Sequence, residues 1–116
     1  PHKKFTPGQV TALNAARHLI GQQPYGSLSL TDIARQVGTN VFTLKSGFRE
    51  LFGTTVFGYW NELRMQEARQ LVLDSHLSIK EIAAQIGYQH PQHFSTAFKK
   101  NFGVSPGEYR KTSPFI

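Results

Sequence analysis

The sequence predicts an all-α fold of about seven helices, in which two similar subdomains are joined by a long linker helix. Three observations predict this fold: a stretch of the chain that occurs twice, Ser and Gly residues where helices begin and end, and apolar residues at helical spacing. The length of 116 residues suits one domain or two very small ones. We expect one domain, 1–116, with a first unit at 6–55, a linker helix at 56–74 and a second unit at 75–110.

The internal repeat is the main observation. Residues 28–38, LSLTDIARQVG, match residues 77–87, LSIKEIAAQIG, at an offset of 49 with six identical pairs. After this stretch the second copy has one extra residue, and the match continues at an offset of 50 as far as Gly53 and Gly103. Each copy is about 26 residues long, so the architecture is predicted to contain the same unit twice.

Each copy carries signals for a short helix, a tight turn and a second helix. A Ser three residues before a carboxylate begins the short helix, because the hydroxyl caps free backbone N–H groups. These pairs are Ser29 with Asp32 and Ser78 with Glu81. A Gly follows each short helix, at the position where a left-handed backbone is favoured. These residues are Gly38 and Gly87.

The second helix of each copy has one apolar face. Three large apolar residues follow one another at four-residue steps, which places them along the same side of a helix. They are Leu44, Phe48 and Phe52 in the first copy and Phe94, Phe98 and Phe102 in the second. We therefore expect this face to be buried and the opposite, more polar face to be exposed.

Two further helices flank the repeat. Thr6 and Pro7 are typical of a helix start, and the apolar stripe that follows predicts a helix up to Gly21. The stretch 56–73 predicts the linker helix, which would be roughly 25 Å long. Residues 22–27 and the tail from Thr112 are expected to be loops, and a last short segment should end near Tyr109.

Composition limits the possible functions. Lys and Arg total 13 against 7 Asp and Glu, a net charge of +6 that favours a polyanionic partner, either nucleic acid or an anionic membrane. The absence of Cys excludes disulfides, thiolate zinc sites and cysteine nucleophiles. No apolar run approaches the roughly 20 residues of a membrane span, so we expect no membrane partner.

Neither a metal site nor an active site is predicted. His90 and His93 have a spacing that can bind a metal ion, but no third ligand is near them in the sequence. Asp74, Ser75 and His76 are the residue types of a hydrolase triad, but adjacency in sequence does not give the geometry of a triad. We expect no cofactor, no metal and no enzymatic activity.

A short helix, a Gly-containing turn and a second helix with a polar outer face are typical of the helix-turn-helix motif, whose second helix enters the DNA major groove. A single copy also occurs in all-α proteins that bind no DNA. Two copies joined by a helix favour DNA, because successive major-groove faces are about 34 Å apart. The alternative is a helical protein-interaction module that recruits a partner such as RNA polymerase.

The sequence also resembles a known family, the AraC/XylS transcription regulators, from about Thr6 to Arg110. The resemblance is carried by Ile33-Ala34, by Tyr59-Trp60-x-x-x-Arg64-Met65-x-x-Ala68-x-x-Leu71-Val72, by Ser78-Ile79-x-Glu81-Ile82-Ala83-x-x-x-Gly87-Tyr88, and by Phe94-Ser95-x-x-Phe98-Lys99-Lys100-x-x-Gly103-x-Ser105-Pro106-x-x-Tyr109-Arg110. In addition, the stretch Phe52-Gly53-Thr54-Thr55-Val56-Phe57 is similar to members that regulate siderophore and iron uptake, such as the pyochelin regulator.

This resemblance implies a cytoplasmic bacterial transcription regulator that binds double-stranded DNA, with one second helix in each of two successive major grooves. The family suggests activation of transcription, although repression is compatible with the same residues. RNA polymerase is a further partner that we expect. Family members often carry a separate effector or dimerisation domain, which we expect to be absent from this chain.

Base contacts are expected on the exposed face of each second helix, both from the family and from the apolar periodicity. The residues are Val41, Phe42, Lys45 and Ser46 in the first unit, and Pro91, Gln92, His93 and Thr96 in the second. A Gln can pair with adenine, a Lys can reach guanine or a phosphate, and Phe42 or the Thr96 methyl group can contact a thymine methyl. Many family members have Arg in place of Ser46 and Thr96, so bidentate guanine contacts are not expected there.

Phosphate contacts are expected beside these positions. Arg49, Lys99 and Lys100 lie toward the ends of the second helices, where cations can hold the protein on DNA without specifying sequence. The capped helix starts at Ser29 and Ser78 could offer backbone N–H groups to phosphate.

Overall fold

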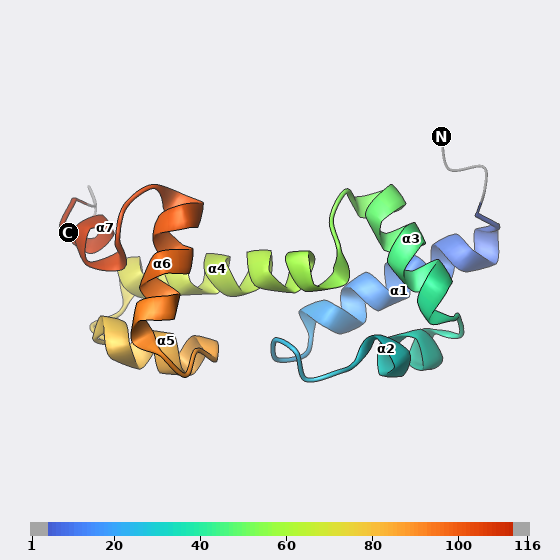
Figure 1. The fold of residues 1–116 in the computed structure, drawn as a ribbon, viewed down its shortest axis with the longest axis horizontal. Coiled ribbons are helices and arrows are strands. Elements are labelled where there is room, and N and C mark those ends of the chain that lie inside the picture. Colours follow the sequence, from blue (N-terminus) through green and yellow to red (C-terminus); the bar gives the residue numbers. More distant parts are fainter. Residues whose placement is uncertain (1–4, 113–116) are drawn as a thin grey trace. The chain divides into compact units, whose positions relative to one another are not determined.

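A computed structural model describes residues 5–112, and within this range the chain forms seven α-helices and no strand (Figure 1). The predicted all-α fold is therefore confirmed. The helices are α1 (Pro7–Gly21), α2 (Leu30–Val37), α3 (Val41–Phe52), α4 (Val56–Asp74), α5 (Ile79–Ile86), α6 (Pro91–Phe102) and α7 (Pro106–Thr112).

The helices belong to two compact units, one up to Glu62 and one from Leu63. The boundary lies inside α4, which is one continuous helix of 19 residues. Its first turns contribute Val56 and Trp60 to the core of the first unit, and its later turns contribute Met65 and Val72 to the core of the second. Helix α4 is thus a structural part of both units.

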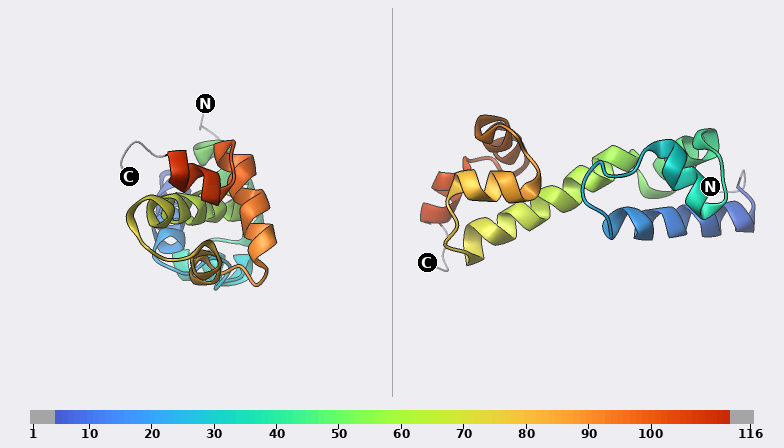
Figure 2. Two further views of the ribbon diagram at one scale, coloured as in Figure 1. Left: turned by 90° about the vertical axis from the view of Figure 1, so that its left-hand side faces the viewer. Right: turned by 90° about the horizontal axis from the view of Figure 1, so that it is seen from below.

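In the first unit, α1, α2 and α3 surround a common core (Figures 1 and 2). Its buried residues are Leu13, Ala16, Ile20, Ile33, Ala34, Leu44, Phe48, Val56 and Trp60. The indole Nε1 of Trp60 donates a hydrogen bond of 3.1 Å to the carbonyl of Gln23 and so fixes the loop between α1 and α2. Leu44 and Phe48 are fully buried as predicted, whereas Phe52 is half-buried.

In the second unit, α5, α6 and α7 pack with the later turns of α4. Its buried residues are Met65, Ala68, Val72, Ile82, Ala83, Ile86, Phe94 and Phe98. Tyr109 of α7 packs edge-on against Phe98, with ring centroids 5.5 Å apart. Arg110 follows it and donates from Nε to the carbonyl of Val72 at 2.9 Å, which ties α7 to α4.

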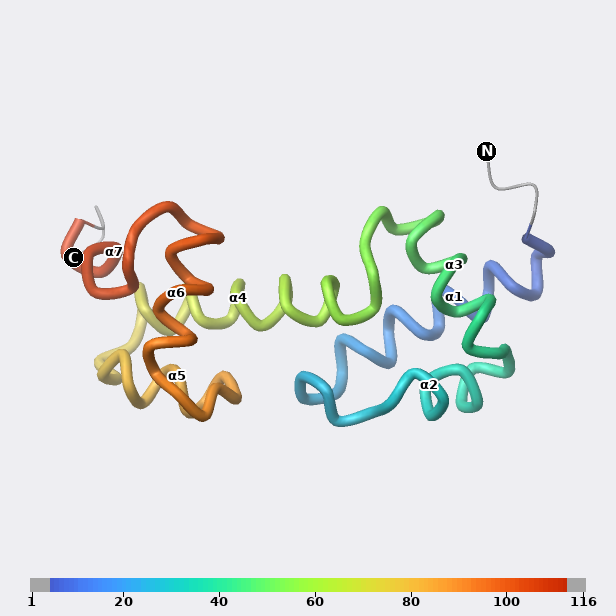
Figure 3. Tube along the Cα trace, viewed as in Figure 1, coloured from blue at the N-terminus to red at the C-terminus, as the bar shows by residue number. Residues whose placement is uncertain are grey.

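The predicted caps are present. The hydroxyls of Ser29 and Ser78 accept the backbone N–H of Asp32 and Glu81, each at 3.0 Å. Gly38 and Gly87 end the short helices with φ of +79° and +103°, a backbone region that strains other residues. The chain then turns sharply into α3 and α6, as the trace in Figure 3 shows.

The structural repeat is longer than the 26 residues found by sequence comparison. Arg17 of α1 lies over the ring of Phe52 at 4.4 Å, and Arg69 of α4 lies over the ring of Phe102 at 5.6 Å. The later turns of α4 therefore occupy in the second unit the place that α1 occupies in the first. Each unit has four helical segments. The sequence similarity between α1 and the later turns of α4 is limited to three identical pairs at an offset of 52, which are Ala16 with Ala68, Arg17 with Arg69 and Leu19 with Leu71.

The end of the chain differs from the expectation. Helix α7 continues beyond Tyr109 to Thr112, whose hydroxyl donates to the carbonyl of Glu108 at 2.9 Å. No Gly or Pro between Glu108 and Thr112 ends the helix earlier. The rest of the expected tail loop, residues 113–116, lies outside the described residues.

Candidate nucleic-acid interface

The outer face of α3 carries the expected residues of the first unit. Phe42 is 80% exposed, and Lys45 and Arg49 are exposed one and two turns further along the same helix. Asn40 caps the start of the helix by accepting the N–H of Thr43 at 2.8 Å. Val41 is half-buried and packs against the core of its unit, so it has much less free surface than Phe42.

The outer face of α6 is polar. Gln92, His93 and Thr96 are exposed in its first two turns, and Lys99 and Lys100 are exposed in its last turn. Pro91 is half-buried at the first helical position. The structure thus exposes most of the expected residues of each unit on the outer side of one helix, whereas Val41, Ser46 and Pro91 are half-buried.

The two hydroxyl groups on these faces are already engaged. Ser46 donates to the carbonyl of Phe42 and Thr96 donates to the carbonyl of Gln92, each over 2.9 Å. A hydroxyl has one proton, so what each group has left for a ligand is its oxygen as an acceptor. In this state Ser46 and Thr96 match base edges that carry an amino group, which are adenine and cytosine.

The starts of α2 and α5 have a structural role. The backbone N–H of Ser29 donates to the Asp32 carboxylate at 3.2 Å, and that of Ser78 donates to the Glu81 carboxylate at 2.8 Å. Hydrogen bonds from the backbone and hydroxyl of Ser29 hold the pKa of Asp32 below its ordinary value, and Ser78 does the same for the pKa of Glu81. A phosphate at either helix start would meet an ionised carboxylate.

His90 and His93 lie close together at the start of α6, with ring centroids 5.0 Å apart. His90 is the N-cap residue, and its side chain makes no capping hydrogen bond. Over residues 5–112, no three His, Cys, Asp or Glu side chains are grouped so that they could hold a metal ion. Both histidines are exposed.

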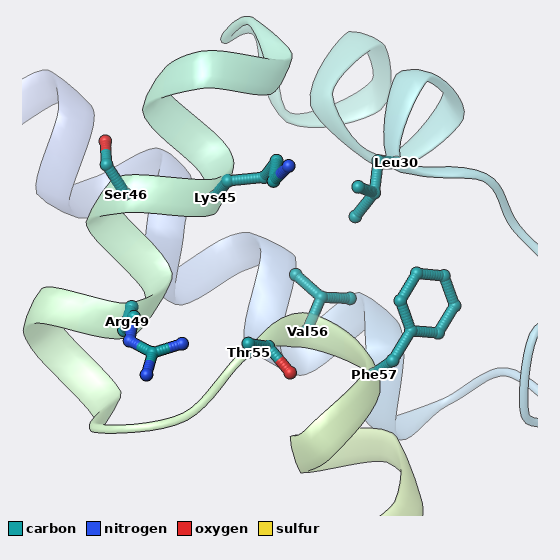
Figure 4. Close-up of a pocket in the computed structure, with 7 residues that line it drawn as sticks. All are labelled: Leu30, Lys45, Ser46, Arg49, Thr55, Val56 and Phe57. Carbon is teal, nitrogen blue, oxygen red and sulfur yellow. The ribbon is translucent and has the colours of Figure 1, made fainter.

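An open cavity of about 500 Å³ borders α3 (Figure 4). Its apolar wall consists of Leu30 from α2 with Val56 and Phe57 from the start of α4. Figure 4 shows the side chains of Lys45 and Arg49 extending from α3 toward this wall. The two cations thus lie at the border between the outer face of α3 and an apolar surface.

No helix in the described part of the chain combines the length and the apolar character needed to cross a membrane.

Comparison with known proteins identifies the family. A model of a helix-turn-helix domain matches residues 33–112. The HTH-type transcriptional regulator GlxA of Rhizobium meliloti is 42% identical over 86 residues, which cover 74% of this chain and 26% of GlxA. A transcriptional regulator from Chromobacterium violaceum, described as containing an AraC-type DNA-binding domain, is 32% identical with a TM-score of 0.80, covering 94% of this chain and 99% of that one.

The chain belongs to the AraC/XylS family. It is an AraC-type DNA-binding domain, and it spans about a quarter of the length of GlxA. The DNA-binding domain of AdpA, solved in complex with a target DNA, shares the fold with a TM-score of 0.68 at 22% identity, covering 91% of this chain and 92% of that one. The likeness to siderophore regulators within the AraC/XylS family stays a prediction, as do the individual DNA contacts.

Sequence reasoning missed two features of this AraC-type domain. The first is the cavity beside α3, whose apolar wall combines residues of α2 and α4 that are distant in the sequence. The second is the close packing of α3 against α1 at Gly47, where a Cβ atom would meet the side chain of Leu13. A Gly inside a predicted helix was the available signal for this close approach.

Proposed function

We propose that this domain binds a specific sequence of double-stranded DNA as part of a bacterial transcription regulator. Helices α3 and α6 each enter a major groove, on successive turns of the duplex. The observation that carries the proposal is that both copies of the unit bury one face of their second helix and leave the opposite face, with its cations, exposed.

The two units offer different chemistry at equivalent positions. At the offset of 50, Phe42 corresponds to Gln92 and Ser46 corresponds to Thr96. A Gln amide can form two hydrogen bonds with adenine, whereas a Phe ring can form none. The two half-sites therefore differ in sequence, and adenine is the base that we assign to Gln92.

The remaining expected base contacts are part of the same proposal. Lys45 reaches guanine or a phosphate from the face it shares with Phe42, and His93 contacts a base beside the one that faces Gln92. Val41 and Pro91 are half-buried, so they contribute at most an edge of apolar surface next to the bases.

Positioning on the DNA backbone is assigned to the cations. Arg49, Lys99 and Lys100 are exposed in the last turns of α3 and α6, and each can neutralise a phosphate. The N–H groups of Ser29 and Ser78 are engaged with carboxylates, so a phosphate at these helix starts would use the N–H groups of the next residues. We therefore assign the larger share of phosphate binding to the three cations.

The proposal is tested by selection from a pool of random duplex DNA, followed by titration of the selected site. We expect a common sequence with two conserved blocks whose centres are about 10 base pairs apart. Binding should weaken steeply between about 50 and about 200 mM salt, because cations on the protein replace counterions of the DNA. Recovery of no common sequence would contradict specific binding.

Three further proposals concern the regulator to which this domain belongs rather than its contacts with DNA. We propose the bacterial cytoplasm as its location, RNA polymerase as a further partner, and a response to effectors in segments outside this domain. No catalytic role is assigned. Tight binding of RNA polymerase by the domain, together with no binding of duplex DNA at low salt, would instead support the protein-interaction module.

A further inference from the structure

Phe42 is the most exposed large apolar side chain among residues 5–112. It is 80% exposed, compared with 41% for Tyr25 and 39% for Phe57. The two less exposed rings pack against each other with centroids 6.4 Å apart. The other Phe residues of α3, Phe48 and Phe52, pack together on the opposite side of the helix. Phe42 therefore contributes to no core, and its surface is available to a ligand.

The surroundings of Phe42 favour DNA as that ligand. It is the second residue of α3, in the first turn, where helix-turn-helix proteins place residues that contact base edges. Lys45 and Arg49 are exposed on the turns that follow. An apolar ring next to two cations matches a polyanion that also has apolar groups in its groove.

Base chemistry then selects one partner for the ring. In the major groove, thymine presents a C5 methyl group, whereas guanine and adenine present hydrogen-bonding atoms and cytosine presents an amino group next to an unmethylated C5. A Phe ring that covers such polar groups would remove their water without replacing its hydrogen bonds, which is unfavourable. A methyl group, in contrast, gains from being buried against the ring.

We propose that Phe42 is a specificity-determining residue that recognises the C5 methyl group of one thymine in the half-site of the first unit. This inference rests on the proposed DNA binding and makes it specific for one chemical group. It applies to the first unit alone, because Gln92 occupies the equivalent position in the second. The same contact should favour 5-methylcytosine over cytosine, since 5-methylcytosine, like thymine, carries a methyl group on C5.

The test uses the selected DNA site and changes one methyl group at a time. Each thymine is replaced in turn by deoxyuridine, and the thymine that responds is then replaced by cytosine and by 5-methylcytosine. One buried methyl group corresponds to about a four-fold change in the dissociation constant. We expect about this loss for deoxyuridine at one position of the first half-site, and a similar gain for 5-methylcytosine over cytosine.

Three variants complete the test. Phe42→Ala should bind thymine and deoxyuridine equally at the responding position, and Phe42→Leu, which keeps an apolar side chain, should retain part of the difference. Gln92→Ala is the matched control, because it weakens binding through the second unit and should leave the methyl effect unchanged. Circular dichroism melting of each variant checks that the fold is retained.

The outcomes separate this inference from the proposed function. If a common sequence is selected but deoxyuridine equals thymine at every position, the role of Phe42 is wrong while specific DNA binding stands. A methyl effect that persists unchanged in Phe42→Ala also overturns the inference. If no common sequence is selected, the proposed function itself fails.

Discussion

Gly47 of α3 lies directly against Leu13 of α1. A Cβ atom at Gly47 would be 2.5 Å from Cδ1 of Leu13, and Leu13 is fully buried. Such a distance is far below van der Waals contact, so the side chain of Leu13 occupies the space that a larger residue at position 47 would need. In the second unit, Ala97 stands at the equivalent position.

This packing predicts the effect of Gly47→Ala on stability. Replacing Gly by Ala inside a helix favours folding by about 1 kcal/mol, but overpacking a core costs about 1–3 kcal/mol. We expect overpacking to be the larger effect, so that the free energy of unfolding falls by about 1 kcal/mol in urea denaturation.

The double variant with Leu13→Ala tests the reason for this loss. Leu13→Ala alone should cost about 2–5 kcal/mol, because it leaves a cavity in the core. In that background Gly47→Ala should become stabilising, since the added methyl group has space. A stabilising effect of Gly47→Ala in the unchanged chain would show that α3 can move away from α1.

The separate cores predict that damage to one unit is felt mainly in that unit. Phe48 and Phe98 are equivalent residues, each fully buried in the core of its own unit. Replacing either by Ala should cost about 3–5 kcal/mol. In hydrogen exchange, Phe48→Ala should deprotect the amides of α2 and α3 most, and Phe98→Ala those of α5 and α6. Equal deprotection of both units by each variant would mean that the cores unfold as one.

The capping carboxylates predict a loss of stability in acid. The pKa of Asp32 lies below its ordinary value of 3.8 because of hydrogen bonds from the backbone and hydroxyl of Ser29, and the pKa of Glu81 lies below 4.5 for the same reason at Ser78. Folding therefore favours the ionised forms. This contribution is present above about pH 4.5 and is lost as the pH falls through the lowered values.

The measurement is the melting temperature between pH 7 and pH 2. Asp32→Asn and Glu81→Gln should each melt lower than the unchanged chain at pH 7 and depend less on pH below about 4.5. Glu67→Gln is the control, because Glu67 is an exposed carboxylate inside α4 rather than at a helix start. A Glu81→Gln variant with the same acid dependence as the unchanged chain would contradict the assigned role.

Base contacts and phosphate contacts predict different responses to DNA sequence. Gln92→Ala should lose about 1–3 kcal/mol on the selected site and discriminate less at one base pair. Lys99→Ala should weaken binding to all sequences alike and reduce the slope of log K against log salt by about 1. Titrations with the selected duplex and with single-base variants at several salt concentrations separate the two. Sequence-independent losses in both variants would remove the base contact at Gln92.

The fold was predictable because its signals are local. Ser29 and Gly38 mark the ends of α2 through hydrogen bonds and backbone angles that involve only nearby residues. The four-residue spacing of Leu44 and Phe48 likewise indicated the buried face of α3 without knowledge of its partners. The exposed residues of the candidate interface were predictable in the same way, because they lie on the side of each helix opposite its apolar residues.

Features that depend on packing between distant segments were not predictable. The contact of Gly47 with Leu13 requires knowing how α3 crosses α1, and the cavity beside Lys45 requires knowing where α4 begins relative to α2. The hydrogen bond from the Ser46 hydroxyl to the carbonyl of Phe42 was also not predictable, since a Ser in a helix can bond either to the backbone of its own helix or to a ligand.

The sharing of α4 has a consequence for dissecting the chain. Trp60 completes the first core and Met65 begins the second, so these two contributions are separated by little more than one helical turn. A fragment that ends before Trp60, or one that begins after Met65, would lack part of its own core. The smallest fragments that keep complete cores must overlap within α4, and chimaeras that exchange one half of the domain between relatives should be joined inside this helix with its buried residues retained.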